Sequence, residues 1–457
     1  MPKTVTYVCQ ECGSQQLRWH GRCPDCGGWG SLVEEAVAPP ASARAPVPDV
    51  PKITTSAAVP ISDVPPGAEP RRPSGVGEFD RVLGGGAVPG SAILLAGDPG
   101  IGKSTLLLQV GYALACAGHR TLYVTGEESL QQMRMRSERL KTMHEEMLAL
   151  SEVELDPILQ HIYLHKPALA VIDSIQTTFD GRIESAPGSV GQVRTTALRL
   201  IRAAKETGAT VLLIGHVTKE GQIAGPRVLE HMVDVVLELE GDRDFNYRTL
   251  HAVKNRFGPT HEIGIFTMGD RGMEEVPNPS AAFLSERQLG TPGSAVVAVM
   301  EGTRALLAEV QALVTPGSGF GAPRRNANGV DSRRVAHVLA VLEKRCHFNL
   351  GQHDVFIHVP GGLKAFEPAT DLAMALAVAS SFKDVPVDPD VVCFGEVGLT
   401  GEVRTVSHAD RRVLEAARQG FQTCLLPPGK LPGGKKQTIK CMPVQNLEQA
   451  FGVAMQR

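Results

Sequence analysis

The feature that most constrains this chain is the glycine-rich segment GDPGIGKS at residues 97–104. It follows the apolar run AILLA and precedes STLLLQVGYALA, which has helical character. The spacing fits the phosphate loop G-x-x-x-x-G-K-[ST], which lies between a strand and a helix. We expect backbone N–H groups to cradle nucleotide phosphates, Lys103 to reach the β- and γ-phosphates, and Ser104 to meet Mg²⁺. The predicted ATP-binding residues are Gly97, Asp98, Pro99, Gly100, Ile101, Gly102, Lys103, Ser104 and Thr105.

Short apolar runs and helical stretches alternate around this segment. RTLYVTGEE, ALAVIDS and TVLLIGH have the pattern of buried strands, and VGQVRTTALRLIRAAKE has that of a helix. Continuous apolar strands that alternate with helices predict a mainly parallel sheet covered on both faces, and therefore an α/β fold. Two later β-rich runs, DVVLELEG and RTLHAVKNRFG, have no helix between them, which predicts an antiparallel edge of the sheet.

Polar residues at the strand ends are the candidate catalytic groups. Asp173 ends ALAVIDS, where a carboxylate can hold the magnesium shell. Glu127 and Glu128 end the next strand after the phosphate-loop helix, and one of them is expected to activate the attacking water. We favour Glu127, with Glu128 as the alternative; both could instead be acids favoured by a helix N-terminus. His216 ends TVLLIGH and is the candidate γ-phosphate sensor, unless it is an ordinary strand-end histidine.

Four cysteines cluster near the N-terminus in the pattern Cys9-x2-Cys12-x10-Cys23-x2-Cys26. Four thiolates at this spacing predict a closed, tetrahedral structural zinc site. Each pair is followed by glycine, which allows the tight turn of a zinc knuckle. A module of this size cannot form a stable core unaided, so we expect metal binding to drive its folding. A redox-active CxxC pair is the alternative interpretation.

Composition indicates where the chain divides. Ten prolines between residues 36 and 73 predict a semi-rigid linker. The expected organisation is a zinc finger at 1–35, the linker at 36–73, an ATPase domain at 74–276, a connector at 277–288 and a further domain at 289–457. The net charge of −3 argues against a globally basic nucleic-acid binder but permits local basic patches. No apolar export signal or membrane-spanning run is apparent, so a cytoplasmic location without membrane contact is expected.

A basic pentapeptide follows the strand TLHAV. It consists of Lys254, Asn255, Arg256, Phe257 and Gly258, in which two cations flank a polar residue before a Phe-Gly turn. From the residues alone, an exposed basic turn explains the pattern as well as a functional motif does.

Together these motifs resemble one family, the bacterial RadA/Sms recombination and repair ATPases. The resemblance covers the whole chain in order, through WHGRCPDCGGWGSL, SGVGEFDRVLGGGAVPGS, GDPGIGKS, YVTGEES, VIDSIQT, APGSVGQVR, GHVTKEGQIAGPRVLEHMVD and KNRFG. VIDSIQT, GPRVLEHMVD and KNRFG are far more specific to the family than the phosphate loop is. One departure is Gly30-Ser31, where the family often has Asn-Thr.

The resemblance implies a RecA-like ATPase that acts on single-stranded and branched DNA with a RecA-type recombinase, as a homo-hexameric ring. It implies that Lys254 and Arg256 act in trans on the neighbouring subunit's nucleotide, as an arginine finger does. It also places DNA-facing loops at residues 177–190 and 217–227, where Lys219 and Arg227 are the candidate phosphate contacts. ATP, Mg²⁺ and structural Zn²⁺ are the implied cofactors.

The C-terminal region resembles the Lon protease domain, an α+β fold whose proteolysis uses a Ser–Lys dyad. Ala369 stands where the serine belongs and Asp410 where the lysine belongs, so we expect a scaffold without protease activity. Basic residues crowd this region, which predicts a DNA-binding surface, although they could be ordinary solvated helix faces. The main candidates are Arg324, Arg325, Arg333 and Arg334, and a second group comprises Arg404, Arg411, Arg412 and Arg418.

The leading interpretation is therefore an ATP-driven, DNA-dependent motor of recombination and repair that remodels or branch-migrates recombination intermediates. One alternative is a RecA/KaiC-like regulatory ATPase without a DNA substrate, because the segment SGVGEFDRVLGGG suits that group too. A Lon-type ATP-dependent protease is the other alternative, and it lacks its serine and lysine.

Overall fold

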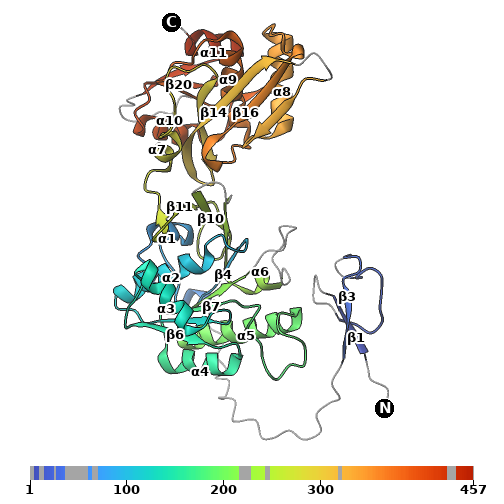
Figure 1. The fold of residues 1–457 in the computed structure, drawn as a ribbon, viewed down its shortest axis with the longest axis vertical. Helices are drawn as coiled ribbons and strands as arrows, with labels where there is room; N and C mark the ends of the chain where they lie inside the picture. Colours follow the sequence, from blue (N-terminus) through green and yellow to red (C-terminus); the bar gives the residue numbers. More distant parts are fainter. Residues whose placement is uncertain are drawn as a thin grey trace, which may run out of the picture. The chain divides into compact units, whose positions relative to one another are not determined.

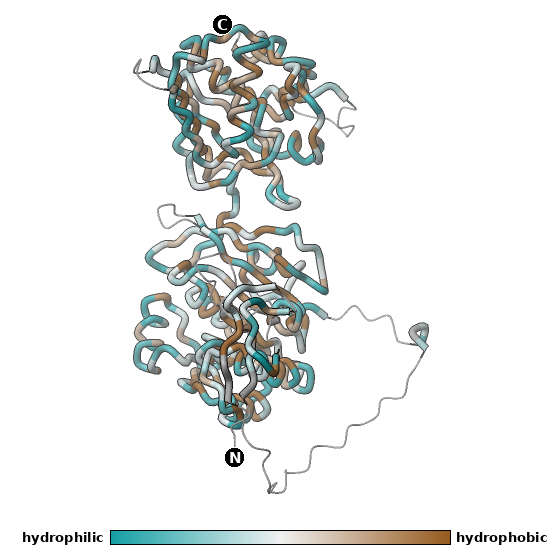
Figure 2. Tube along the Cα trace, turned by 90° about the vertical axis from the view of Figure 1, so that its right-hand side faces the viewer, coloured by the Kyte–Doolittle hydropathy of each residue, from teal (hydrophilic) through white to brown (hydrophobic). Residues whose placement is uncertain are grey.

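The computed structural model describes residues 5–9, 15–24, 27–36, 60–63, 70–215, 228–241, 247–317, 322–429 and 439–455. The chain forms two compact units (Figure 1). Unit 1 is Met1–Glu240, Leu250–Thr260 and Met268–Met273; unit 2 is Gly241–Thr249, His261–Thr267 and Glu274–Arg457. In each unit the apolar segments lie inside and the polar segments outside (Figure 2). Among the described helices, none combines the length and apolar character that crossing a bilayer requires.

The N-terminal module is a small antiparallel sheet. Its strands are β1 (Val5–Cys9), β2 (Gln15–Gln16) and β3 (Leu32–Ala36), in the order β2-β1-β3. Among its described side chains, Cys9, Cys23 and Leu32 form a buried apolar cluster, with Tyr7 packed against it. So small an apolar cluster cannot hold a sheet together alone, which agrees with the expectation that metal binding stabilises the module.

A nine-stranded sheet forms the centre of the ATPase region. Its strand order is β12-β11-β10-β9-β4-β8-β7-β5-β6, and the pairs β9–β4, β4–β8, β8–β7, β7–β5 and β5–β6 are all parallel. The strands are β4 (Ala92–Gly97), β5 (Thr121–Thr125), β6 (Met147–Ser151), β7 (Leu169–Asp173), β8 (Thr210–Ile214), β9 (Val235–Glu240), β10 (Tyr247–Asn255), β11 (Ile263–Gly269) and β12 (Gly272–Glu275).

Helices cover both faces of the parallel part, as the sequence pattern predicted. On one face α4 (Leu155–His165) and α5 (Val190–Thr207) pack their apolar sides on alternate residues of the central strands. On the other face α2 (Lys103–Cys116) contacts β4, β5, β6 and β7. The remaining helices of this region are α1 (Gly77–Leu83), α3 (Leu130–Leu140) and α6 (Val228–Met232).

The strands from β9 to β12 are neighbours in chain order. Since parallel neighbours need a crossover of roughly a dozen residues, the short connections between these strands make them antiparallel. The antiparallel edge expected from the two helix-free β-runs is therefore present.

Unit 2 is built on a seven-stranded mixed sheet in the order β15-β16-β14-β13-β17-β20-β21. The long hairpin of β13 (Ser294–Glu301) and β14 (Arg304–Pro316) is its centre. The other strands are β15 (Arg325–Asn328), β16 (His353–His358), β17 (Val391–Cys393), β20 (Thr423–Leu426) and β21 (Lys440–Pro443), with β18 (Glu396–Val397) and β19 (Val403–Arg404) as a separate pair.

The helices of unit 2 pack on both faces of this sheet. The helix α9 (Asp371–Lys383) is buried along most of its length, and it packs between the sheet and α8 (Ser332–Arg345). The helix α10 (Ala409–Arg418) contacts β13 and β14, and α11 (Leu447–Ala454) contacts α9. The segment predicted as a connector, residues 277–288, contains α7 (Pro279–Leu284). Phe283 of α7 lies in the apolar core of this unit.

A buried ion pair joins α10 to the segment before α9. Arg412 is fully buried, and its Nη1 and Nη2 donate to the two carboxylate oxygens of Glu367 at 2.6 and 2.7 Å. Nη1 also donates to the Ala298 carbonyl at 2.5 Å and Nε to the Ser407 carbonyl at 3.0 Å. The prediction that Arg412 contributes to a basic surface is therefore wrong: the side chain is an internal crosslink.

Replacing Glu367 by Gln should destabilise unit 2 by about 3–5 kcal/mol, because it leaves the Arg412 charge buried without its carboxylate. Hydrogen exchange of the β13 and α10 amides measures the effect. The control is Glu402→Gln, whose partner Arg404 is exposed, and its exchange should match the wild type. Equal protection in Glu367→Gln and the wild type would contradict the structural role of the pair.

Candidate functional site

The parallel strands β4, β5, β7 and β8 bring the predicted catalytic residues to one edge of the sheet. Their carboxyl ends carry the phosphate loop after Gly97, the turn with Glu127 after Thr125, and Asp173 at the end of β7. In open parallel sheets this edge is where ligands bind. His216 follows β8, and it lies outside the described residues, as do Lys219 and Arg227.

The phosphate loop has the backbone that its glycines permit. Gly97 has φ of 149°, and a Cβ there would clash with the carbonyl oxygen of Leu239 on β9. The helix α2 begins at Lys103, so its first N–H groups face the loop. The Lys103 ammonium is buried and donates to the carbonyl oxygens of Gly97 at 2.6 Å and Asp98 at 2.9 Å. Nucleotide phosphates fit this cradle of N–H groups and one cation.

Three carboxylates stabilise this buried cation. Burial lowers the pKa of the Lys103 ammonium, and the negative charges of Asp173, Asp98 and Glu127 oppose that shift, in this order of size. Acids at the ends of three different strands therefore act on one ammonium, that of Lys103. Acids clustered beside a phosphate-loop lysine suit a divalent cation and an activated water.

Asp173 is held by a tyrosine from the neighbouring strand. Tyr123 on β5 is fully buried, and its hydroxyl donates to Asp173 Oδ2 at 2.6 Å. Burial, and next the charge of Asp173, raise the pKa of Tyr123 well above its ordinary value, so the phenol remains a hydrogen-bond donor. The bond fixes one carboxylate oxygen of Asp173 and leaves the other one for a cation.

The two candidate glutamates have different surroundings. Ser174, the residue after Asp173, donates its hydroxyl to Glu127 Oε1 at 3.0 Å. Glu128 instead forms an ion pair with Arg136 of α3, at 3.0 Å between Oε1 and Nη1. The glutamate that contacts the Asp173 segment and acts on Lys103 is therefore Glu127, which supports it as the residue that activates water.

A glycine allows these two strand ends to approach each other. The N–H of Gly126 donates to the Asp173 carbonyl at 2.8 Å, and a Cβ on Gly126 would clash with the Thr177 hydroxyl. The Thr177 hydroxyl in turn donates to the Ser174 carbonyl at 2.9 Å. Close backbone contact thus sets the Glu127–Ser174 distance.

The basic pentapeptide begins at the end of β10. The Lys254 ammonium donates to the carbonyl oxygens of Glu230 and Val233, both at 2.7 Å, where it satisfies the C-terminal end of α6. Burial, and next the charge of Arg256, lower the pKa of Lys254. Within one chain, Lys254 therefore holds the segment between α6 and β9.

Arg256 is the more accessible cation of the pentapeptide, with a side chain that is 54% exposed. Its Nη1 lies 3.1 Å from Asp234 Oδ1, and the other oxygen of Asp234 accepts the N–H of Ala92 at the start of β4. Asn255 accepts the N–H of Phe257 at 2.9 Å, which closes the turn. Gly258 follows it, close to Asn255. The turn thus presents one arginine to solvent.

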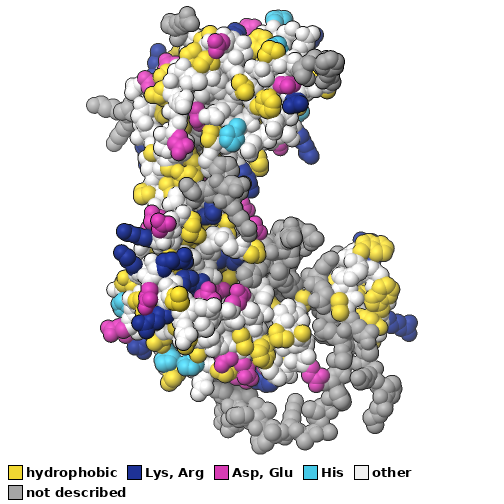
Figure 3. Space-filling model, viewed as in Figure 1, with side chains coloured by type: hydrophobic (Ala, Val, Ile, Leu, Met, Phe, Trp, Pro, Cys, Tyr) yellow, Lys and Arg dark blue, Asp and Glu magenta, His cyan; other side chains and the backbone are white. Residues whose placement is uncertain are grey.

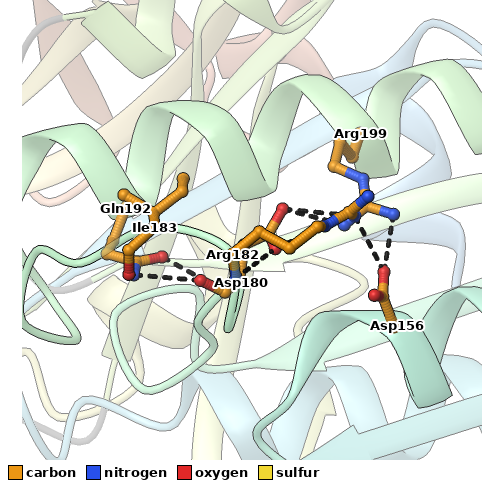
Figure 4. A network of polar contacts seen from close by, with 6 residues as sticks. All are labelled: Asp156, Asp180, Arg182, Ile183, Gln192 and Arg199. Carbon is orange, nitrogen blue, oxygen red and sulfur yellow. Dashed lines mark hydrogen bonds and ion pairs between the residues drawn. The ribbon is translucent and has the colours of Figure 1, made fainter. Parts of the chain in front are cut away.

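A polar network holds the segment after β7, which the sequence analysis assigned to a DNA-facing loop (Figure 4). Buried Asp180 accepts bonds from Arg182 at 3.0 Å and from Arg199 at 2.8 Å, and both arginines also reach Asp156 of α4. Gln192 donates to the carbonyls of residues 180, 183 and 185, and it accepts the Asp180 N–H. The segment is therefore fixed to α4 and α5, and its arginine is already paired.

The four arginines predicted as DNA contacts in unit 2 differ in availability. Arg334 forms a half-buried pair with Asp371 at 2.5 Å and with Glu396 at 3.3 Å. Arg325 is exposed, but it donates to the carbonyls of His353 and Leu350. Arg324 and Arg333 are exposed, with side chains that the structure leaves to solvent. The structure thus does not bring all four together as one basic surface.

At the Lon-like positions, Ala369 is fully buried and Asp410 is exposed at the start of α10. Neither side chain can act as the nucleophile or the base of a Ser–Lys dyad.

Two of the four predicted zinc ligands, Cys12 and Cys26, lie outside the described residues. Cys9 and Cys23 are both buried and pack in one small cluster. The turn after Cys23 is closed by backbone bonds from Gly27 N to Cys23 O at 2.9 Å and from Cys23 N to Gly28 O at 2.8 Å. Cys9 Sγ contacts the Ser31 hydroxyl at 3.2 Å. Two buried thiols, a tight turn and a polar neighbour fit a thiolate-held metal.

Sequence patterns did not predict the roles of Tyr123, Ser174 and Arg136, which orient Asp173, Glu127 and Glu128. A polar aromatic residue within the aliphatic run RTLYVT was the available signal for Tyr123, since a buried hydroxyl needs a partner. Nothing local indicated Arg136.

Three family descriptions match consecutive parts of this chain. They are the rubredoxin metal binding domain at residues 7–34, the AAA domain at residues 80–222 and the Lon protease (S16) C-terminal proteolytic domain at residues 335–457. These matches confirm the expected fold class: an α/β ATPase core with an N-terminal metal-binding module and a Lon-like C-terminal domain.

Similarity to individual proteins extends over nearly the whole chain. It is 47% identical over 458 residues to the DNA repair protein RadA of Bacillus subtilis (strain 168), with 100% of both chains covered. It is 49% identical over 453 residues to the DNA repair protein RadA of Brucella abortus (strain 2308), covering 97% of this chain and 96% of the other. It is 47% identical over 454 residues to the RadA protein of Listeria monocytogenes, covering 99% and 98%.

Replacing Glu127 by Gln should lower ATP turnover by about 10²–10⁴-fold, because the amide cannot accept a proton from water. ATP binding should persist, since Lys103 and the phosphate loop are intact. Glu128→Gln is the matched control and should retain most turnover, because Glu128 is paired with Arg136. Steady-state phosphate release beside equilibrium ATP binding measures both variants. Equal losses in the two variants would contradict the assignment.

Proposed function

This chain belongs to the RadA family of DNA repair proteins, and from that premise we propose that it is a DNA-dependent ATPase of homologous recombination. It acts as a ring-shaped motor that processes or branch-migrates recombination intermediates together with a RecA-type recombinase. The observation that carries the proposal is the convergence of Lys103, Asp173 and Glu127 at one sheet edge, in a chain similar over its full length to DNA repair proteins.

In this proposal the phosphate loop binds ATP through its N–H groups, and Lys103 exchanges its carbonyl partners for the β- and γ-phosphates. Ser104 and Asp173 would hold Mg²⁺, and Tyr123 keeps the Asp173 carboxylate oriented. The metal would neutralise negative charge on the phosphates. Glu127, positioned by Ser174, accepts the proton of the attacking water.

The proposed active form is a homo-hexameric ring in which Arg256 reaches the nucleotide of the neighbouring subunit. Its exposure supports this role, because an arginine finger must extend from the surface of its own subunit. Lys254 would have to release two carbonyl oxygens to act in the same way. Arg256 is thus the better candidate for the trans contact, and Lys254 has a positioning role in its own chain.

The DNA contacts of the proposal are phosphate contacts by scattered cations. Arg324 and Arg333 are exposed, and Lys219 and Arg227 remain candidates on the segment 217–227. Arg334 contributes only if its pair with Asp371 opens, which costs a buried interaction.

The remaining parts have supporting roles in the proposal. Cys9, Cys12, Cys23 and Cys26 would hold one structural Zn²⁺, which would supply the folding energy that the small described core of the module lacks. The Lon-like domain is a scaffold without protease activity, because Ala369 and Asp410 replace the catalytic pair.

The test is ATP turnover with and without single-stranded DNA. The proposal predicts that DNA raises the rate, and that Arg256→Ala and Lys103→Ala each abolish the stimulated rate. Mixing the two variants should restore part of it, because some interfaces then join an intact phosphate loop to an intact Arg256 of the neighbour.

Two outcomes would contradict the proposal. An ATP turnover rate that does not change when DNA is added would favour a regulatory ATPase without a DNA substrate. A mixture no more active than the separate variants would refute the trans role of Arg256.

A further inference from the structure

The N-terminal module exposes its two largest aromatic side chains. Trp19 is 59% exposed and Trp29 is 78% exposed, and Leu17, two residues before Trp19, is 83% exposed. Tryptophan is usually buried to a large extent, so two exposed indoles on one small module indicate a contact surface. In Figure 3, hydrophobic and basic side chains both lie on the visible face of this module.

The two indoles converge on a glycine. A Cβ placed on Gly21 would lie 3.8 Å from Trp19 Cη2 and 3.9 Å from Trp29 Cζ3. The backbone holds this arrangement: Gly30 N donates to Gly21 O at 2.9 Å, and Arg22 pairs with Trp29 in an antiparallel bridge. Two indoles are therefore presented on a frame fixed by main-chain bonds, and a side chain at residue 21 would contact both of them.

Cations accompany the indoles within the described segment 15–24. Residues 15–24 contain Arg18, His20 and Arg22 but no Asp or Glu. Arg18 and His20 are exposed, and Arg22 is fixed by donating from Nε to the Gly27 carbonyl at 2.8 Å. Aromatic planes beside positive charge suit a ligand that combines flat rings with negative groups, which is the chemistry of single-stranded nucleic acid.

We propose that this indole face, residues 17–22 with Trp29, binds single-stranded nucleic acid. Bases stack on Trp19 and Trp29, and Arg18 and Arg22 contact the phosphates. A duplex is excluded because its bases are already stacked on one another. The site goes beyond the proposed function, because it requires neither ATP nor a ring.

The chain contains only two tryptophans, both on this face, so tryptophan fluorescence reports on it directly. Full-length, zinc-loaded protein without nucleotide is titrated with oligothymidylate, oligouridylate and a DNA duplex. Single strands should quench the fluorescence saturably, and added salt should weaken their binding. The duplex should have little effect. Comparing the affinities for oligothymidylate and oligouridylate shows whether the face binds DNA or RNA.

Trp19→Ala and Trp29→Ala should each weaken single-strand binding about tenfold, which is about 1.4 kcal/mol. Gly21→Leu should weaken it as well, because its side chain enters the space between the indoles while both remain. Leu164→Ala is the matched control, since it removes an equally exposed apolar side chain from α4. Unchanged zinc content verifies that the module is folded in each variant.

Wild-type affinity in the two tryptophan variants would overturn the proposal. The proposal would also be overturned if no single strand changed the tryptophan fluorescence while the anisotropy of a labelled strand showed that it binds elsewhere on the chain. Quenching by an added recombinase, and by no nucleic acid, would assign the face to a protein partner instead. The DNA dependence of ATP turnover is a separate readout, so either proposal can fail without the other.

Discussion

The parallel register of β4, β5, β7 and β8 is the constraint on which the site depends. Because these strands run in one direction, their carboxyl ends meet, and segments far apart in the chain share one edge. The edge gathers one buried ammonium, Lys103, and three acids. The ammonium is tolerated there because the acids offset the desolvation that lowers its pKa. Without the strand order, the same residues would be unrelated surface charges.

Contacts between strand ends then give residues of the same type different roles. Two adjacent glutamates have different partners, because Ser174 reaches Glu127 and Arg136 holds Glu128. Two cations of the pentapeptide differ for the same reason, since Lys254 is bound to carbonyl oxygens and Arg256 is exposed. Partners rather than residue type thus decide which side chain is available for chemistry.

Sequence patterns predicted the parts of the structure that local chain geometry specifies. The phosphate loop, the central strands and Asp173 lie where strand, glycine and helix signals placed them. Contacts between distant residues could not be predicted in this way. Arg412 and Arg334 looked like surface charge because their acids, Glu367 and Asp371, lie 45 and 37 residues away. Tyr123 was missed for the same reason, since Asp173 is 50 residues further along the chain.

The central claim is that the edge built around Lys103 is the centre of ATP turnover. The most direct measurement is the ATP hydrolysis rate of Lys103→Ala at saturating single-stranded DNA. The account predicts a fall of at least about a hundredfold, because no other cation reaches the transferred phosphate from the loop. Lys205→Ala, on the exposed end of α5, is the control and should hydrolyse ATP as the wild type does. Wild-type turnover in Lys103→Ala would contradict the account.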